Sequence, residues 1–353
     1  MSETPVLAVK YLRSVFVDKV PFPNIIKLIK DKHHEDGSDR NLLLIIGYAL
    51  RNYYLFSRII KNDLSSDADE ALFLILFANH FLKTFSREEL DEILDEKALL
   101  DYEKLLVILK DVTDPRDLIN VTLEENTTFY IQERYNIPAW VVKGLLKSYG
   151  SAVTLAISSR LPSLKNRFYR LMKGATMPEG FKESAFPGYI LRDSHKVLVD
   201  HQIMFSCSPI YEIMMRELPL DGHKEIAYYL DSFSALPFRI ALDNDDDIVS
   251  TILISQTLDY KKMLSQRTNL GFKNFEVAMA TPETIVSNLS KKYDIFVVSP
   301  TSTELTEINN NPAYLINFNV DDYDALIARQ KALIIEATEH LHDGGLIVYF
   351  VST

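Results

Sequence analysis

Two hydrophobic patterns divide the chain. Between about residues 5 and 150, apolar positions recur at the three- and four-residue spacing of amphipathic helices, and polar loops separate the runs. From about residue 197 onward, short apolar runs alternate with helical stretches. Strands that alternate with helices are typical of a parallel sheet with helices on its faces. The sequence therefore predicts an all-α part followed by an α/β part.

The all-α part carries local signals for helix starts and stops. Helices are expected over residues 6–17, 24–32, 41–54 and 71–85. Asp67 or Asp69 is placed to cap the helix that begins near residue 71, and Ser86 with Glu89 matches a capping box for the next one. A later helix is expected to start at Pro138, to carry Trp140 as an anchor for an interdomain contact, and to end at residue 150, a glycine.

In the α/β part, apolar runs predict strands over residues 226–230, 248–254, 275–279, 295–298 and 346–351, with a helix over 208–217. An Asp343-Gly344-Gly345 turn is expected before the last strand. Sites of parallel α/β sheets lie at the carboxyl ends of strands. The segments that follow residues 230, 298 and 351 are therefore expected to contribute to a site.

Charge is unevenly distributed. The chain has 353 residues and a net charge of −11, yet residues 151–196 hold 8 basic and 3 acidic residues. Basic and aromatic side chains are interleaved there, a mixture suited to RNA phosphates and bases. The alternative is an ordinary solvated face. The candidate RNA-binding residues are Arg160, Lys165, Arg167, Phe168, Tyr169, Arg170 and Lys173.

Composition excludes several classes of protein. The single cysteine, Cys207, rules out an internal disulfide or a cysteine-based metal site, and it suits a reducing cytoplasm, where we expect the protein to be located. The longest apolar stretch, residues 71–82, is too short to span a bilayer, and the amino-terminal residues lack a signal-peptide pattern. No metal site and no membrane partner are expected.

Several motifs occur in a fixed order along the chain. Tyr135, Pro138 and Trp140 form a Tyr-x-x-Pro-x-Trp pattern at a helix start, residues 266–271 form a helix end, and Pro300 and the glycine pair at 344–345 accompany the last two strands. In this order they resemble the Sun/Fmu (RsmB-type) family of 16S rRNA cytosine-5 methyltransferases, whose corresponding helix end reads Asn-x-x-Arg-Leu-Gly. The resemblance implies an all-α NusB-like domain (1–150), a reduced RNA-binding subdomain (151–196) and a Rossmann-like class I methyltransferase domain (197–353). That last domain is expected to be truncated after its fifth strand.

The catalytic and cofactor positions depart from that family. Thr301 and Ser352 stand where it has its two cysteines, and a hydroxyl forms far less anion near neutral pH than a thiol. The family closes a glycine turn around S-adenosylmethionine, whereas Leu236, Pro237 and Phe238 occupy that segment here and are expected to project into the cofactor space.

Other positions that would hold the cofactor are also altered. Asp231 is retained, whereas Ile254 and Thr281 lie where the family's strand ends carry acidic residues. We therefore expect no S-adenosylmethionine binding, unless the family's function is retained.

Three functions follow from these observations. The first is a catalytically inactive RsmB-like homologue that binds rRNA, a ribosomal precursor or a protein partner. The second is an active S-adenosylmethionine-dependent rRNA cytosine-5 methyltransferase. The third uses the NusB-like part as a protein-interaction module. The uninterrupted apolar strand 346–351 is expected to be a sheet edge that pairs with a partner or a second copy.

Overall fold

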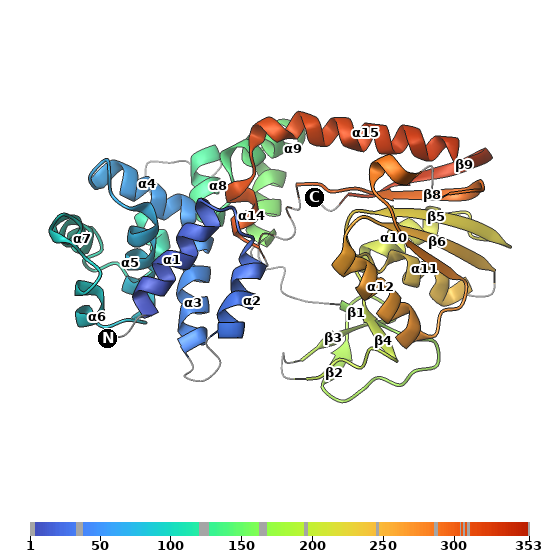
Figure 1. Ribbon diagram of the computed structural model, residues 1–353, viewed down its shortest axis with the longest axis horizontal. Coiled ribbons are helices and arrows are strands. Elements are labelled where there is room, and N and C mark those ends of the chain that lie inside the picture. The colour runs from blue at the N-terminus through green and yellow to red at the C-terminus, as the bar shows by residue number, and fades with distance from the viewer. Residues whose placement is uncertain are drawn as a thin grey trace. The chain divides into compact units, whose positions relative to one another are not determined.

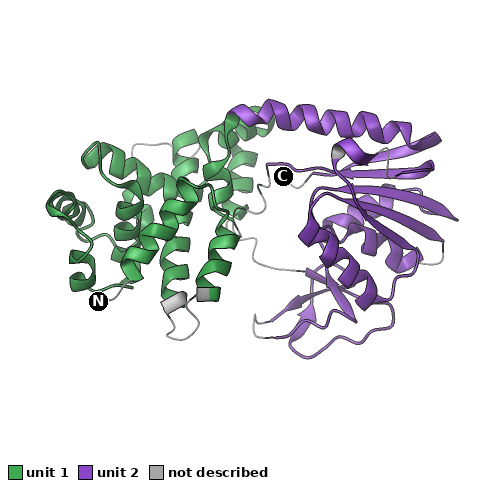
Figure 2. Cartoon of the chain, in the orientation of Figure 1, with its two compact units in different colours: residues 1–164, 304–320 green, residues 165–303, 321–353 purple. Residues whose placement is uncertain are grey.

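The structure is a computed structural model that describes residues 4–32, 38–119, 127–161, 168–193, 197–244, 247–285, 289–303, 305, 308 and 311–351. The chain forms two compact units, which Figure 2 shows in two colours. Residues 1–164 and 304–320 make up the helical unit, and residues 165–303 and 321–353 make up the α/β unit. The chain thus has a helical amino-terminal region and a parallel-sheet α/β unit.

Amphipathic and fully apolar helices form the helical unit. The helix α5 is apolar on all sides and every residue from Ala71 to Asn79 is buried, as expected for a central helix. Asp69 caps it, since its carboxylate accepts from the backbone N–H groups of Ala71 and Leu72. The helices are α1 (Thr4–Phe16), α2 (Phe22–Lys32), α3 (Ser38–Arg51), α4 (Tyr53–Asp63), α5 (Glu70–Leu82), α6 (Arg87–Asp91), α7 (Glu96–Ile108), η1 (Pro115–Leu118), α8 (Thr128–Tyr135), α9 (Ala139–Arg160) and α14 (Ala313–Asn317).

Gly150 interrupts the helix α9, as expected. Its φ of 74° and ψ of 175° are not helical, so the first helical stretch ends there and a second stretch continues to Arg160. The Thr154 hydroxyl donates to the Gly150 carbonyl at 2.7 Å, near the start of the second stretch. The compact helical unit includes this second stretch and extends through residue 164.

Residues 304–320 also depart from the expected division, because they pack with the helical unit rather than with the α/β unit that surrounds them in sequence. Phe318 stacks on Trp140 with ring centroids 5.2 Å apart, and the Asn317 side-chain amide donates to the Val15 carbonyl at 2.7 Å. Trp140, expected to anchor an interdomain contact, thus holds this returning segment within one unit.

The α/β unit is built on a parallel sheet of β5 (Lys224–Leu230), β6 (Ile248–Ile254), β7 (Phe275–Met279), β8 (Tyr293–Ser299) and β9 (Leu341–Tyr349). The strand order is β7-β6-β5-β8-β9 and every pairing is parallel (Figure 1). All five predicted strands are confirmed, and the bounds of β6 and β7 agree with the prediction. The order reverses between β5 and β8, which is where ligands bind in open α/β sheets.

Helices cover both faces of this sheet. The helices α10 (Ile210–Glu217), α11 (Leu236–Asn244) and α12 (Thr257–Leu270) pack on one face, and α15 (Tyr323–Glu339) packs on the other. Two single turns, η3 (Pro282–Thr284) and η5 (Val320–Asp322), complete the described helices. None of the helices in the described ranges is long and apolar enough to cross a membrane.

The strand β9 is longer than predicted. Asp343, Gly344 and Gly345, expected as a turn, lie inside the strand, where the register with β8 shifts between Tyr293 and Ile295. Glycine is required there, because Gly344 has a φ of 81° and a Cβ on Gly345 would lie 3.0 Å from the His342 carbonyl oxygen. In the described chain β9 pairs with β8 alone, so it forms one edge of the sheet.

The basic segment is not a plain connector. It contributes β1 (Phe168–Leu171), β2 (Phe181–Glu183) and β3 (Tyr189–Arg192) to a small antiparallel sheet that β4 (Met204–Ser206) completes, in the order β2-β3-β1-β4. One face packs against the helices of the parallel sheet through Tyr189 and Phe205. The opposite face has its own core around Tyr169 and Ile190. In these short strands charged residues alternate with apolar ones, so no continuous apolar run marks the strands in the sequence.

Candidate functional site

A buried carboxylate lies where the strand order of the parallel sheet reverses. Asp231 follows β5 directly and is 5% exposed. Its Oδ1 accepts from Tyr229 Oη at 2.9 Å and Ser255 Oγ at 3.0 Å, and pairs with Arg329 at 2.9 Å. Its Oδ2 accepts from the Thr301 N–H at 2.7 Å and from Thr301 Oγ1 at 3.0 Å.

These contacts join β5 to β8 at the place where the strand order reverses. The backbone N–H of Asp231 donates to the Ser299 carbonyl at 3.0 Å, and the Thr301 carbonyl accepts from the Gln330 amide at 2.8 Å. Five donors thus occupy the Asp231 carboxylate, which has about four lone-pair positions. The polar groups that a ligand would need at this point are therefore already bound to one another.

The segment after β5 is core rather than a cofactor loop. Leu236, Pro237 and Phe238 are buried in the first turn of α11, and Phe238 stacks on Phe275 with centroids 5.5 Å apart. The expectation that these side chains project into the cofactor space was wrong, because the helix begins at Leu236 and turns them into the aromatic core. They leave no glycine backbone on which a ligand could lie closely.

The other cofactor positions provide no acidic partner at the strand ends. Ile254 is fully buried at the end of β6, and Ser255 after it is bonded to Asp231. Thr281 after β7 forms a capping box with Thr284 at the start of η3. The residues present therefore do not fit S-adenosylmethionine in the manner that the resemblance implies.

Thr301, which the resemblance aligns with a family cysteine, is held by internal hydrogen bonds. Its hydroxyl donates to Asp231, and Asp231 is in turn paired with Arg329, so the carboxylate that contacts this hydroxyl is already occupied. Ser352 lies outside the described residues. In the described ranges no group of three or more His, Cys, Asp or Glu side chains could hold a metal ion.

Cys207 is buried at the end of the small sheet, on the face toward α10 and α11. Burial raises the pKa of its thiol to about 12, and the nearby Arg239 and the Tyr189 hydroxyl only partly offset this. A thiol with that pKa has roughly a thousandfold less thiolate near neutral pH than an exposed cysteine. Cys207 is therefore a structural residue and not a nucleophile.

We expect native Cys207 to resist 5,5′-dithiobis(2-nitrobenzoic acid) at pH ~8 because both its burial and its raised pKa suppress the thiolate. The measurement is the absorbance of released thionitrobenzoate, with the protein in denaturant as the control that releases one equivalent. Complete labelling of the folded protein within minutes would show an accessible, activated thiol instead.

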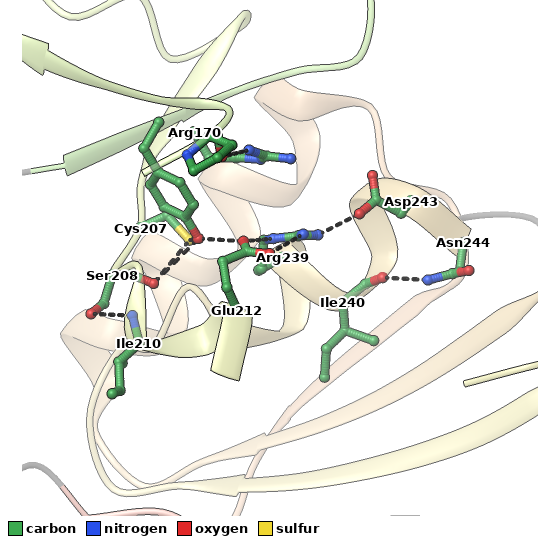
Figure 3. Close-up of polar contacts among 11 residues, drawn as sticks. Arg170, Cys207, Ser208, Ile210, Glu212, Arg239, Ile240, Asp243 and Asn244 are labelled. Atoms are coloured by element: carbon green, nitrogen blue, oxygen red, sulfur yellow. Dashed lines mark hydrogen bonds and ion pairs between the residues drawn. The ribbon is translucent and has the colours of Figure 1, made fainter. Parts of the chain in front are cut away.

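A buried arginine connects the small sheet to the parallel sheet (Figure 3). Arg239 of α11 is 5% exposed and forms two bonds to Glu212 of α10, at 2.5 and 2.8 Å, and one to Asp243 at 2.7 Å. Tyr189 of β3 donates its hydroxyl to the same Glu212 carboxylate at 2.7 Å. These bonds surround the Arg239 guanidinium, so the network positions the elements that it joins.

An open pocket lies beside this network in the small sheet. Its volume is about 460 Å³, and its walls come from β1, the end of β2, the turn that follows and the start of β3. The lining residues are Arg170, Leu171, Met177, Glu183, Ser184, Phe186, Pro187, Gly188, Tyr189 and Ile190.

The predicted RNA-binding residues lie in different places. Arg170 lines the pocket, and Lys173 is exposed in the turn after β1. Phe168 is partly buried against Phe186, and Tyr169 is 3% exposed in the small sheet's own core. Tyr169 therefore has no ring face free for stacking, which differs from the expectation.

Three further candidates and one residue that was not predicted remain. Arg160 is exposed at the end of α9, in the helical unit, while Lys165 and Arg167 lie outside the described residues. Phe186, whose ring is exposed, was not predicted as a site residue. The signal in the sequence was the Pro-Gly pair directly after it.

No protein-family model matches the chain, and no curated protein matches it in sequence. Among solved structures, that of PH0851 is similar with a TM-score of 0.66 and 12% identity, over 94% of this chain and 80% of that one. A methyltransferase homolog protein from Pyrococcus horikoshii is similar with a TM-score of 0.50 and 12% identity, over 63% of this chain and 75% of that one. At such identities the likeness shows the fold alone. The chain has a helical region followed by an α/β unit of the Rossmann-like methyltransferase fold.

Proposed function

We propose that this chain is an RNA-associated pseudoenzyme. It has a methyltransferase fold without catalytic activity and is a homologue of RsmB-type rRNA methyltransferases. Its helical unit is the NusB-like part and its small sheet is the reduced RNA-binding part. It acts in the cytoplasm on rRNA or a ribosomal precursor. The similarity to a methyltransferase homolog protein supports the fold on which this proposal rests.

The observation that carries the proposal is the internal saturation of Asp231. In a methyltransferase of this fold, the end of the first strand has to leave polar groups for the cofactor. Here Asp231 is 5% exposed and satisfied by Tyr229, Ser255, Thr301 and Arg329. A ligand would have to break an ion pair and several hydrogen bonds in order to enter.

An active cytosine-5 methyltransferase is the less favoured function. It needs a nucleophile that adds to the base, and a hydroxyl such as that of Thr301 requires a general base. The carboxylate beside Thr301 is paired with Arg329 and accepts four further hydrogen bonds, so its lone-pair positions are already occupied. Neither the cofactor contacts nor the nucleophile of that reaction are supported.

RNA binding is supported by the charge of residues 151–196. They contain 8 basic and 3 acidic residues in a chain whose net charge is −11. A local basic surface with an adjoining pocket is the pattern expected of a protein that contacts RNA at one place. Two exposed apolar side chains, Leu100 and Val107, lie seven residues apart on α7 and favour a second function, protein binding by the helical unit.

Calorimetric titration with S-adenosylmethionine tests the loss of cofactor binding. We expect no binding heat up to about 1 mM ligand, because the core packing of Phe238 and the saturated Asp231 leave no site. S-adenosylhomocysteine serves as a second ligand, and a known methyltransferase as the positive control for the ligand stock. A dissociation constant in the micromolar range would refute the pseudoenzyme proposal.

A further inference from the structure

The pocket of the small sheet contains a pre-positioned guanidinium. Arg170 lies on β1 directly opposite Tyr189 of β3, and its guanidinium carbon is 5.2 Å from the centre of the Tyr189 ring. One amino group, Nη1, donates to the Pro187 carbonyl at 3.0 Å. These two neighbours thus fix the plane of the guanidinium before any ligand arrives.

Gly188 makes room for this arrangement. A Cβ at that position would lie 1.5 Å from Arg170 Nη1, and its φ of 76° also disfavours other residues. The Nε of Arg170 is buried and has no hydrogen-bond partner among the described residues. The chain therefore keeps a charged donor group at the pocket wall without satisfying all of its donors internally, which is unusual for a purely structural arginine.

Two apolar side chains flank the pocket and are exposed to solvent. Phe186 is 47% exposed and Met177 is 42% exposed. The Phe186 ring is held by an edge contact with Phe168 at 5.5 Å and by a turn in which Ser184 Oγ bonds both the N–H and the carbonyl of Phe186. A rigid, exposed ring beside a thioether provides a surface for a flat apolar ligand.

A carboxylate completes the set of groups. Glu183 lines the pocket at the end of β2, is exposed, and forms no ion pair with any residue that the structure describes. The pocket thus combines a planar cation, an anion and an aromatic ring. The ligand that suits this combination is flat and carries donors on one edge and acceptors on another.

We propose that this pocket binds a single unpaired guanine base. Guanine stacks on Phe186, its N1–H and N2–H₂ donors face the Glu183 carboxylate, and its O6 and N7 acceptors face Arg170. The volume of about 460 Å³ lies within the range of small-ligand pockets. This inference rests on the proposed RNA association and adds to it the base that is read.

The test is fluorescence anisotropy of the full chain with a labelled single-stranded adenosine octamer that carries one central guanosine, compared with the all-adenosine octamer. We expect tighter binding of the guanosine-containing strand. Phe186→Ser should weaken it roughly five- to hundredfold, the range found when one stacked base loses its aromatic partner. Glu183→Gln should remove the preference for guanosine, measured as the ratio of the affinities for the two octamers.

Phe129→Ser is the matched control, because Phe129 is 61% exposed on α8 of the helical unit and lies outside the pocket. It should leave both affinities unchanged, and thermal melting should show that all three variants fold. Guanosine monophosphate as competitor separates the two sources of the base. Displacement only at millimolar concentration supports RNA, and displacement at the affinity of the octamer assigns the pocket to a free nucleotide.

The outcomes separate this inference from the proposed function. Binding of both octamers that is equal and insensitive to Phe186→Ser would overturn the guanine pocket and leave RNA association standing. Absence of binding to either octamer at low salt, with no effect of guanosine monophosphate, would overturn both the pocket and the RNA part of the proposed function.

Discussion

Phe238→Ala is expected to lower the free energy of unfolding of the α/β unit by about 3–5 kcal/mol, the usual effect of removing a fully buried aromatic side chain. Phe238 is completely buried and its ring lies within 6.5 Å of the rings of four other phenylalanines, namely Phe205, Phe233, Phe272 and Phe275. The loss combines the transfer of the ring to water in the unfolded state with the cavity that it leaves. This residue stands where the resemblance places a glycine of the cofactor turn.

Amide hydrogen exchange of peptides from β5 and β6 measures this loss in the α/β unit, and the fluorescence of the single tryptophan, Trp140, follows the helical unit separately. Phe186→Ala makes the same chemical change at an exposed ring of the same unit and is expected to change stability by less than about 0.5 kcal/mol. A loss below about 1 kcal/mol for Phe238→Ala would mean that the segment is not core, and a cofactor turn would again be possible.

The elements of the parallel sheet could be predicted because each is a continuous apolar run. The strand β6 (Ile248–Ile254) is buried by layers on both faces, so most of its residues are apolar and the run itself marks the strand. The helix caps at Asp69 and Ser86 were predictable for a similar reason, since a cap depends on neighbouring backbone groups alone.

The position of Asp231 at the end of a strand was predictable, but its hydrogen-bond and ion-pair partners were not. The sequence places it at the end of a strand, whereas its partners Thr301 and Arg329 lie 70 and 98 residues away. The same holds for Leu236–Phe238. A resemblance assigns these residues to a cofactor turn, and only the packing of distant aromatic residues shows that they belong to the core.

The small sheet and residues 304–320 could not be predicted, because short segments there depend on distant partners. The strand β2 has three residues, Phe181–Glu183, and no periodicity can be read over that length. Residues 304–320 lie between two elements of the α/β unit, yet the Trp140–Phe318 stacking places them with the helical unit. The burial of Tyr169 could not be predicted for the same reason, since it depends on contacts with Phe181 and Ile190.

Arg239→Met is expected to destabilise the α/β unit by about 3 kcal/mol at neutral pH, the lower end of the effect of removing one partner from a buried ion pair. The value is low in that range because Glu212 and Asp243 are 29% and 50% exposed and can be partly hydrated. Arg239→Lys is the matched control. It keeps the charge but cannot form both parallel bonds to Glu212, so we expect an intermediate loss.

The pH dependence of the loss of stability in Arg239→Met shows whether the charge of Arg239 causes it. Burial alone would raise the pKa of Glu212, but the bonds from Arg239 and Tyr189 outweigh burial and hold the pKa below its ordinary value of 4.5. A lowered pKa stabilises the folded state fully above 4.5, and this contribution is lost as the pH falls through the lower folded value. In Arg239→Met, burial is opposed only by the Tyr189 hydrogen bond and the charge of Arg170, so the pKa of Glu212 rises and acid no longer removes the interaction with Arg239.

The difference in stability between the wild type and Arg239→Met should therefore be largest above pH ~5 and should narrow as the pH falls below about 4.5. Urea unfolding at a series of pH values, followed by circular dichroism, measures this difference. A difference that stays constant from neutral pH to about pH 3 would mean that Arg239 contributes through packing of its side-chain stem rather than through its charge. The small sheet would then be fixed to the parallel sheet by its apolar face around Tyr189 and Phe205 alone.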